Sequence, residues 1–356
     1  MMMQTKIFSI DPSDIDIAAV NECAKIINLG GTVAFPTETV YGLGAAATDK
    51  TAAKKIYAAK GRPSDNPLII HIADPKDAEA YAFTSPLYYK LATAFMPGPL
   101  TVILPKKGSI PSEVTGGLDT VAVRCPSHEI ARALIRQAKV AIAAPSANLS
   151  GSPSPTRAEH VIKDMSGRID AIVDGGYCDI GLESTIIKLD GNTATLLRPG
   201  AITVDALECV CDKVKIASAV TEALEKDARP LSPGMKYRHY APASPLILLD
   251  GALEDVKEFL ILSQKNENCA ILCYSEEKAW LDDKNIIDVG AKDDLSSQAQ
   301  RLFSALREAD TFGADVIYAH LPVMDGLGLA LYNRLIRAAA HTIKKIDHIS
   351  EYDKKD

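Results

Sequence analysis

The chain has 356 residues, of which 47 % are hydrophobic and 24 % charged, and its formal net charge is −7 at pH 7. This composition is typical of a globular protein, and the length is large for one hydrophobic core, so two domains are expected. The longest apolar runs, such as 68–72 and 140–144, are far shorter than the roughly 20 residues that cross a bilayer. The first ten residues lack the pattern of a secretory signal. These features predict a cytoplasmic protein without a membrane span.

The charge is divided unevenly along the chain. Residues 1–205 contain 20 Lys and Arg against 21 Asp and Glu, whereas residues 206–356 contain 19 against 25. Any anionic ligand is therefore expected in the first half. Nucleic-acid binding without sequence specificity depends on clustered Lys and Arg. The near-neutral first half thus argues against stable, direct binding of nucleic acid.

The seven cysteines are an odd number scattered through the chain, which argues against a disulfide framework, and we expect them to be reduced. Two close pairs, Cys209 with Cys211 and Cys269 with Cys273, could act as metal ligands. Neither pair is accompanied by a second Cys or His pair at zinc-finger spacing, so no metal site is predicted.

Residues 1–210 alternate between helical and extended patterns. Apolar residues recur at helical spacing over 15–29, and a strand is expected at Thr32–Phe35 after Gly30 and Gly31. Further helices are expected near 51–60, 76–82, 86–95, 128–138 and 156–165, and strands near 68–73, 100–104, 120–124, 140–144, 170–174, 184–189 and 194–198. The alternation predicts an α/β domain whose polar loops follow apolar strands, where such folds place their sites.

A second, smaller α/β domain is expected over residues 245–356. Strands are predicted at 245–249, 269–273, 285–288 and 314–318, and helices at 252–264, 276–281, 294–311 and 327–340. Strands that alternate with helices indicate a parallel sheet of Rossmann-like type. The segment lacks a complete G-x-G-x-x-G fingerprint.

Residues 211–244 interrupt this alternation and are interpreted as a linker. Within them, 230–242 holds three prolines and two tyrosines together with Lys, Arg and His, unlike a flexible Gly/Ser tether. We interpret the segment as a lid that closes over the active site. The alternative stays open that the prolines only space the two domains while the aromatic residues pack between them.

The candidate chemistry lies in loops of the first half, because the chain has no Walker motif, no H-E-x-x-H and no G-x-S-x-G. Lys60 and Arg62 follow a predicted helix. They are either ordinary helix-end cations that complement the helix dipole or a clamp for a polyphosphate.

Other polar residues lie within or directly after apolar strands. His71 is either a satisfied core histidine or a ligand, whereas Arg124 at the end of a buried strand needs an anionic partner such as a substrate carboxylate. Ser146 and Asn148 could bind a ligand or cap a turn.

Several motifs, in this order, resemble those of the YrdC-type threonylcarbamoyl-AMP synthases, and the resemblance covers essentially the whole chain. The fold it implies is a twisted mixed sheet with helices. The motifs are Gly31–Gly44, which contains Pro36-Thr37-Glu38-Thr39, then Lys60-x-Arg62 with Asn66-Pro67-Leu68, Pro97-Gly98-Pro99-Leu100-Thr101, Pro145-Ser146-Ala147-Asn148, Glu183-Ser184-Thr185-Ile186, Leu197-Arg198-Pro199-Gly200 and Ser232–Pro242.

The resemblance implies a nucleotidyltransferase that joins L-threonine, bicarbonate or CO2, and ATP into threonylcarbamoyl-AMP and releases pyrophosphate. The product would pass to the tRNA threonylcarbamoyl transferase machinery, and Mg²⁺ would accompany ATP. By similarity, threonine is held by Thr39, His71, Arg124, the backbone at Ala144, and Ser184. ATP is held by Arg62, Asn66, Thr120, Ser146, Ser154, Arg198 and Tyr237, with Lys60 near the phosphates. Lys60 and Arg62 are the expected catalytic residues.

Three other functions remain as alternatives. The first half could bind RNA, although its net charge argues against this. The chain could be a carbamoyltransferase subunit related to hydrogenase-maturation proteins, although it lacks their acylphosphatase-like and zinc-finger segments. Finally, the second domain could be catalytic and the first regulatory.

Overall fold

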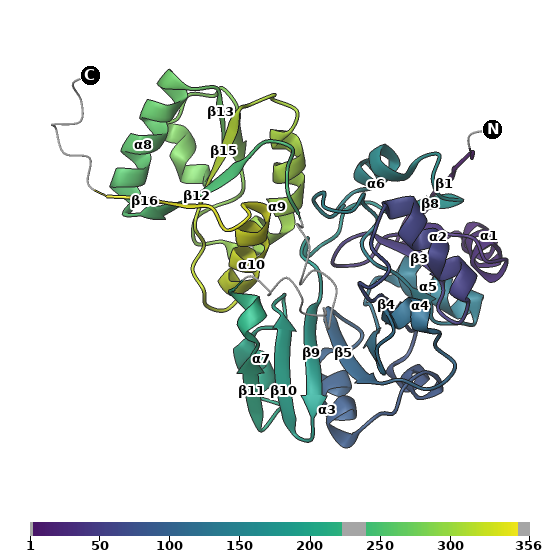
Figure 1. The fold of residues 1–356 in the computed structure, drawn as a ribbon. Helices are drawn as coiled ribbons and strands as arrows, with labels where there is room; N and C mark the ends of the chain where they lie inside the picture. The colour runs from purple at the N-terminus through teal and green to yellow at the C-terminus, as the bar shows by residue number, and fades with distance from the viewer. Residues whose placement is uncertain (1–2, 223–239, 348–356) are drawn as a thin grey trace. The chain divides into compact units, whose positions relative to one another are not determined.

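The computed structural model describes residues 3–222 and 240–347. The chain divides into two compact units (Figure 1). The first comprises Met1–Ser150 and Ser154–Tyr237, and the second comprises Gly151–Pro153 and Arg238–Asp356. The central part of the predicted linker, including Tyr237, lies outside the described residues.

The first unit contains helices and strands in mixed order. They are β1 (Lys6–Ser9), α1 (Ile17–Asn28), β2 (Val33–Phe35), β3 (Gly42–Ala46), α2 (Lys50–Lys60), β4 (Ile69–His71), η1 (Pro75–Ala80), α3 (Pro86–Phe95), β5 (Leu100–Pro105), α4 (Ser112–Thr115), β6 (Thr120–Arg124), α5 (Glu129–Ala138), β7 (Ile142–Ala143), α6 (Ala158–Met165), β8 (Ala171–Asp174), β9 (Thr185–Asp190), β10 (Thr193–Arg198), α7 (Val204–Glu208), β11 (Lys213–Ile216) and η2 (Ser218–Val220).

The described strands of this unit form an 11-stranded sheet in the order β1-β8-β2-β3-β7-β4-β6-β5-β9-β10-β11. Parallel pairs such as β4 with β6 and β5 with β9 alternate with antiparallel pairs such as β5 with β6. Helices α1 and α5 pack together over Phe35 and Ile142 of the sheet. The expected mixed α/β fold is confirmed.

The sequence prediction did not include β1, β3, α4, α7 or η2, and two further segments differ from it in type. Lys213–Ile216, expected as linker, forms the edge strand β11, parallel to β10. Its side chains are mostly exposed, so the segment lacks the alternation of apolar and polar residues that marks a half-buried strand. The helix expected near 76–82 is a short 3₁₀ helix, η1, whose N-terminus is capped by the Asp74 carboxylate.

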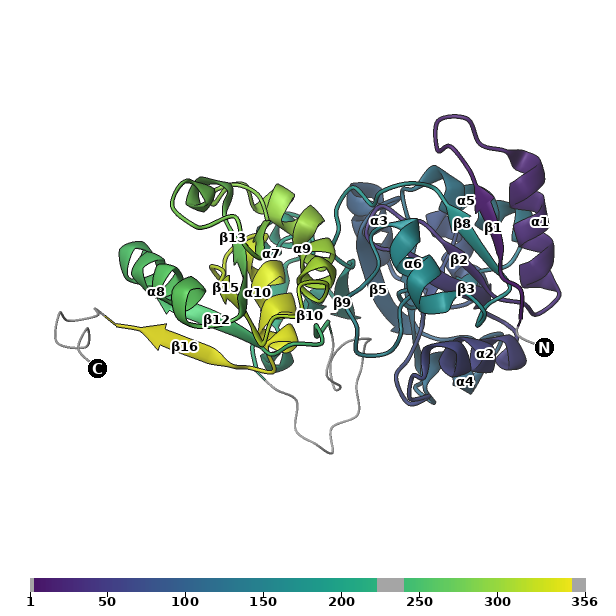
Figure 2. The same ribbon diagram turned by 90° about the horizontal axis from the view of Figure 1, so that it is seen from above.

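The second unit is a parallel α/β domain, as expected. Its elements are β12 (Leu246–Gly251), α8 (Leu253–Asn266), β13 (Cys269–Cys273), η3 (Ser275–Ala279), β14 (Ile286–Asp288), α9 (Leu295–Ala309), β15 (Val316–His320), α10 (Gly328–Ala338) and β16 (Ile343–Ile346). All strand pairs are parallel, in the order β14-β13-β15-β12-β16. Helix α8 covers one face of the sheet, and α9 and α10 cover the other (Figures 1 and 2).

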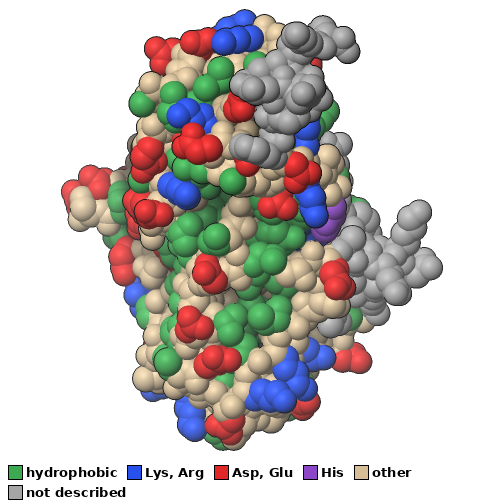
Figure 3. Space-filling model, turned by 90° about the vertical axis from the view of Figure 1, so that its left-hand side faces the viewer, with side chains coloured by type: hydrophobic (Ala, Val, Ile, Leu, Met, Phe, Trp, Pro, Cys, Tyr) green, Lys and Arg blue, Asp and Glu red, His purple; other side chains and the backbone are tan. Residues whose placement is uncertain are grey.

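Within the described ranges, no helix combines the length and the apolar character that a membrane span requires. The face shown in Figure 3 mixes acidic, basic and hydrophobic side chains, so no continuous basic surface covers it. Lys and Arg side chains gather there only in small groups, one of them near the lower edge of the view.

Candidate active site

A row of register partners crosses the sheet of the first unit. His71 at the end of β4 pairs with Arg124 of β6, and Arg124 pairs with Thr101 of β5. Thr101 then pairs with Ile186 of β9, which pairs with Arg198 of β10. Register partners on neighbouring strands project from the same face of a sheet. The fold therefore gathers the imidazole, the two guanidinium groups and the hydroxyl on one face.

Ser184, directly before β9, is fixed against this row. Its Oγ lies 2.7 Å from Oγ1 of Thr101. Arg198 Nη2 donates to Ser184 Oγ at 3.1 Å, and Arg198 Nε donates to the Ser184 carbonyl oxygen at 3.0 Å. The structure thus places Ser184, an expected threonine ligand, in contact with Arg198, an expected ATP ligand.

The loop between β2 and β3 brings further polar groups to the row. Thr37 Oγ1 donates to the Val40 carbonyl oxygen at 2.6 Å and accepts from the Thr39 and Val40 N–H groups at 3.2 Å, which closes a tight turn. Thr39 Oγ1 lies 2.9 Å from Thr37 Oγ1. The loop is buried throughout, and it carries Glu38 to Arg124.

Glu38 and Arg124 form a buried ion pair in which Arg124 Nη2 donates to Glu38 Oε1 at 2.7 Å. Each residue is only 4 % exposed. Glu38 Oε2 and Arg124 Nε are also buried, and neither has a hydrogen-bond partner in the described structure. Buried polar atoms are normally bonded, and an unmade bond costs about 1–3 kcal/mol. These two atoms are therefore positions where a ligand would gain binding energy.

His71 adds a neutral polar group beside this pair. Its Nδ1 lies 3.3 Å from the Ile142 carbonyl oxygen. Burial, reinforced by the Arg124 charge, lowers the pKa of His71 to about 3. The imidazole is therefore uncharged near neutral pH. Its backbone contact fits a satisfied core histidine, and its place in the row fits a ligand-binding residue.

Lys60 is not a solvated helix-end cation. It is 2 % exposed, and its Nζ donates to the Ser146 and Asn148 carbonyl oxygens, both at 2.5 Å. The chain can turn back at this point because Gly61 takes the left-handed conformation, with φ of 61°. Lys60 thereby joins the end of α2 to the loop that follows β7. In this loop, Ser146 Oγ donates to Asn148 Oδ1 at 2.5 Å.

The turn after α2 holds Arg62 and Asn66, both buried. Arg62 Nη2 donates to the Pro67 carbonyl oxygen at 3.3 Å. Asn66 Oδ1 is buried and without a hydrogen-bond partner among the described residues. This amide oxygen could accept from an amino group such as that of adenine.

The remaining expected ligands have definite places, except Tyr237, which lies outside the described residues. Ser154 Oγ donates to Glu183 Oε1 at 2.5 Å. Thr120 begins β6 on the same face as Arg124 because the two are four residues apart in one strand. The Ala144 N–H donates to the Ile69 carbonyl oxygen at 2.8 Å. A backbone contribution of Ala144 to a ligand would therefore come from its carbonyl group.

Three residues at the site had no role in the sequence prediction: Glu38, Thr101 and Glu183. All three belong to motifs that were noticed. Glu38 is the one acidic residue in the stretch 31–44, and an isolated carboxylate amid apolar and hydroxyl residues was an available signal. Pairing with a distant arginine could not be deduced from spacing, since the two lie 86 residues apart.

Two family models match the chain, one after the other along the sequence. The model described as "Telomere recombination", for Sua5, YciO and YrdC proteins, matches residues 25–200. The model described as "Threonylcarbamoyl-AMP synthase, C-terminal domain" matches residues 202–340.

Relatives and solved structures match along nearly the whole chain. The threonylcarbamoyl-AMP synthase of Bacillus subtilis is 44 % identical over 343 residues, which are 95 % of this chain and 98 % of that protein. The synthase of Pyrococcus abyssi is 46 % identical over 327 residues, 91 % of this chain and 94 % of that protein. The crystal structure of P. abyssi Sua5 complexed with L-threonine has a TM-score of 0.88 and 43 % identity, and the match covers 96 % of this chain and 100 % of that chain. The chain therefore belongs to the two-domain Sua5 family of YrdC-type proteins.

Proposed function

We propose that this protein is an L-threonylcarbamoyladenylate synthase, which converts L-threonine, bicarbonate or CO2, and ATP into threonylcarbamoyl-AMP and pyrophosphate. The observation that carries the proposal is the buried pair of Glu38 and Arg124, with one unpartnered atom on each residue. The relatives named threonylcarbamoyl-AMP synthase support the same reaction.

The Glu38–Arg124 pair suits a free amino acid. An α-amino acid carries a carboxylate and an ammonium group on one carbon atom. Arg124 Nε–H would donate to the carboxylate, and Glu38 Oε2 would accept from the ammonium group, so that both orphaned atoms gain charge-assisted bonds. The hydroxyl groups of Thr39 and Ser184 and the neutral His71 would surround the substrate side chain.

The chemistry requires no protein nucleophile. The threonine amine, after loss of a proton, attacks the carbon atom of bicarbonate or CO2 and becomes an N-carboxylate. With bicarbonate, water leaves. A carboxylate oxygen then attacks the α-phosphorus of ATP in line, and the bond to the β-phosphate breaks to release pyrophosphate. We assign the proton lost by the ammonium group to Glu38, and with CO2 the second proton lost by the nitrogen passes to water. Catalysis otherwise consists of positioning and charge stabilisation.

ATP would be held by the groups that surround the threonine pocket. We assign this role to Arg62, Asn66, Thr120, Ser146, Ser154, Arg198 and Tyr237, with Lys60 fixing the loop at Ser146. Among the described residues, no three His, Cys, Asp or Glu side chains could together hold a metal ion. We assign Mg²⁺ to the ATP phosphates, as part of the substrate, because such ions neutralise phosphate charge in transfers at phosphorus.

The product is a labile mixed anhydride, and we propose that it passes to a tRNA threonylcarbamoyl transferase in the cytoplasm. Closure of a lid over ATP would protect it from water. The lid assigned to residues 230–242 falls almost entirely outside the described residues and stays a prediction.

Pyrophosphate release tests the proposal. We expect release from MgATP only when threonine and bicarbonate are both present, together with a threonine-dependent AMP adduct. Serine should be about 10–200-fold less efficient in kcat/KM, because a missing methyl group forfeits roughly 1–3 kcal/mol in a fitted pocket. Release with ATP alone, or equal turnover of serine, would contradict the threonine assignment.

A further inference from the structure

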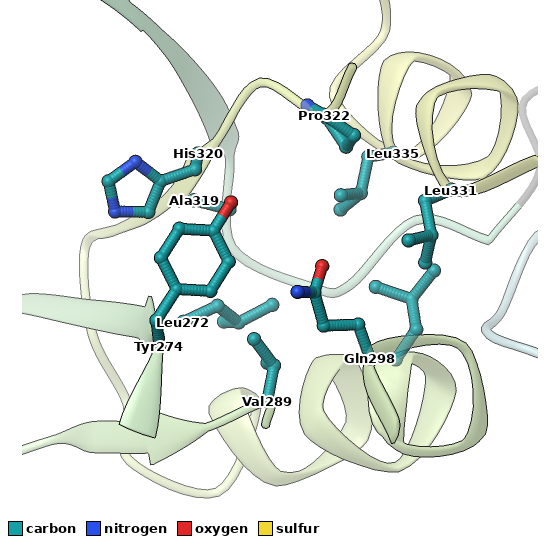
Figure 4. A pocket seen from close by; sticks show the side chains of 10 residues that line it. Leu272, Tyr274, Val289, Gln298, Ala319, His320, Pro322, Leu331 and Leu335 are labelled. Carbon is teal, nitrogen blue, oxygen red and sulfur yellow. The ribbon is translucent and has the colours of Figure 1, made fainter. Parts of the chain in front are cut away.

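The second unit contains a crevice at the carboxyl ends of its parallel strands. A cavity of about 330 Å³ is lined by residues that end or follow these strands, including Gly251, Tyr274 and His320, and by Lys292 and Asp293 after β14. A small apolar cavity of about 30 Å³ shares Tyr274, Gln298 and His320 with it and is closed by leucines of α9 and α10 (Figure 4). Open parallel α/β sheets bind their ligands at this edge.

Gln298 presents an unused acceptor to this crevice. The residue is 6 % exposed, and its Nε2 donates to the Ala291 and Lys292 carbonyl oxygens at 2.7 and 2.8 Å. Because a carbonyl oxygen can only accept, these two bonds fix which end of the amide is nitrogen. Oε1 is therefore directed into the space beside Tyr274 and Pro322, as Figure 4 shows, and it has no hydrogen bond within the described structure.

The wall beside Gln298 is rigid. Glu277 Oε2 accepts from the Tyr274 N–H at 2.9 Å, and Glu277 Oε1 lies 2.8 Å from His320 Nε2. The rings of Tyr274 and His320 are stacked, with centroids 4.6 Å apart and planes 17° from parallel. The buried Glu277 carboxylate thus holds both rings in place before any ligand arrives, which lowers the entropy cost of binding.

The polar groups that face the crevice select the class of ligand. Gln298 supplies an acceptor oxygen, and Asp250 and Asp293 add two carboxylates against one cation, Lys292. A phosphate would meet repulsion here, and the turn after β12 is not glycine-rich. Groups that accept hydrogen bonds and carry negative charge favour a cation with several N–H donors. The leucines of the inner cavity favour a short aliphatic part.

We propose that this crevice is a second ligand site, which binds a small primary amine in its ammonium form. The ammonium group donates to Gln298 Oε1 and to the carboxylates of Asp250 and Asp293, and the aliphatic part lies against Tyr274 and the leucines. The site is independent of the reaction proposed for the first unit.

Fluorescence of Trp280 provides a local readout, because it is the single tryptophan of the chain and follows η3, which contains Glu277. The full-length protein would be titrated with 1,4-diaminobutane, without ATP or threonine, by Trp280 fluorescence and by calorimetry. We expect saturable binding with a Kd at or below about 1 mM, which corresponds to a binding free energy of about −4 kcal/mol. High salt should raise this Kd, because it screens the attraction between charges.

The variants Asp250→Asn and Gln298→Leu should raise this Kd at least fivefold. The matched control Asp283→Asn changes an exposed carboxylate that does not line the crevice and should leave the Kd unchanged. The Asp250 side chain is exposed and makes no hydrogen bond in the described structure, so its variant should fold even if Gln298→Leu does not. Absence of diamine binding, or wild-type binding by Asp250→Asn, would overturn the proposal. A Trp280 response to inorganic phosphate that Lys292→Ala abolishes would also overturn it, in favour of an anion site.

Discussion

Each unit of the protein contains a buried glutamate beside a candidate site, Glu38 in the first and Glu277 in the second, and the hydrogen bonds of these two carboxylates are satisfied to different degrees. Glu38 in the first unit binds Arg124 through Oε1, and its Oε2 has no partner in the described structure. Glu277 in the second unit uses both oxygens, one toward His320 and one toward the Tyr274 N–H. Burial of a charge is costly unless its hydrogen bonds are made. Glu38 therefore keeps one oxygen available for a ligand, as we propose, whereas both oxygens of Glu277 are used to support the surrounding structure.

The largest effect is expected where the charge pair itself is broken. Arg124→Met should destabilise the first unit by about 3–5 kcal/mol, because the Glu38 charge is left buried without a partner. It should also abolish threonine-dependent pyrophosphate release. The double variant Glu38→Leu with Arg124→Met should recover most of the stability but none of the activity. Urea denaturation and a pyrophosphate assay would measure both quantities, and an active double variant would show that the pair is only structural.

The corresponding change in the second unit should lower stability without affecting the threonine reaction. Glu277→Gln loses two charge-assisted hydrogen bonds, each worth about 1.5–3 kcal/mol. The thermal midpoint of the second unit should fall, while KM for threonine should stay within twofold of wild type. Calorimetric scanning and steady-state kinetics would be run on the same preparation. The variant Glu38→Gln would be assayed beside it. An equal rise in KM for threonine in Glu277→Gln and Glu38→Gln would remove the distinction between the two carboxylates.

The two units can also be compared through a lysine at the end of one helix in each. Lys60 in the last turn of α2 is buried, whereas Lys265 in the last turn of α8 is exposed. Lys60→Ala and Arg62→Ala should each lower kcat/KM at least tenfold, equivalent to about 1.4 kcal/mol of barrier. Lys265→Ala serves as the matched control and should change neither activity nor stability measurably. Near-native activity of both Lys60→Ala and Arg62→Ala would mean that the two residues are not required for the reaction.

The last effect concerns the dependence of stability on pH. Between pH 6.5 and about 3 the unfolded chain binds a proton at His71 that the folded chain does not, so this residue makes stability fall as pH falls through that window. Its contribution to the slope is at most about 1.4 kcal/mol per pH unit. Urea midpoints of wild type and His71→Gln, compared from pH 7 to pH 4, should show a shallower dependence in the variant. Parallel curves would mean that His71 accepts the proton in the folded state.

Much of the architecture could be predicted from the sequence because it rests on local patterns. The helix α5 and the strand β6 follow their apolar periodicity, and the alternation of elements in the second unit predicts its parallel sheet. The strand β3 was missed because Gly42–Ala46 is small and entirely buried, so it has no alternating pattern. The edge strand β11 depends on pairing with β10, which no local pattern shows.

The site was predictable in its residue types and less so in its contacts. A motif indicates that Arg124 and Ser184 are important, but the pairings of Arg124 with Glu38 and of Ser184 with Thr101 depend on sheet register. The burial of Lys60 could not be predicted either, because the sequence pattern of a helix end is the same whether or not a loop covers that end. The sequence did not indicate that Gln298 is buried beside a crevice, since glutamine on a helix is ordinarily exposed.

The pairing of β5 with β9 bears on how the protein is made. These two strands are parallel neighbours, yet Leu100 and its partner Thr185 are 85 residues apart in the sequence. A ribosome-bound chain that has emerged only to α6 would expose the open edge of β5, which is a template for intermolecular pairing. The proposed threonine site therefore cannot form before β9 and β10 have been synthesised, and nascent chains stalled before β9 expose the edge of β5.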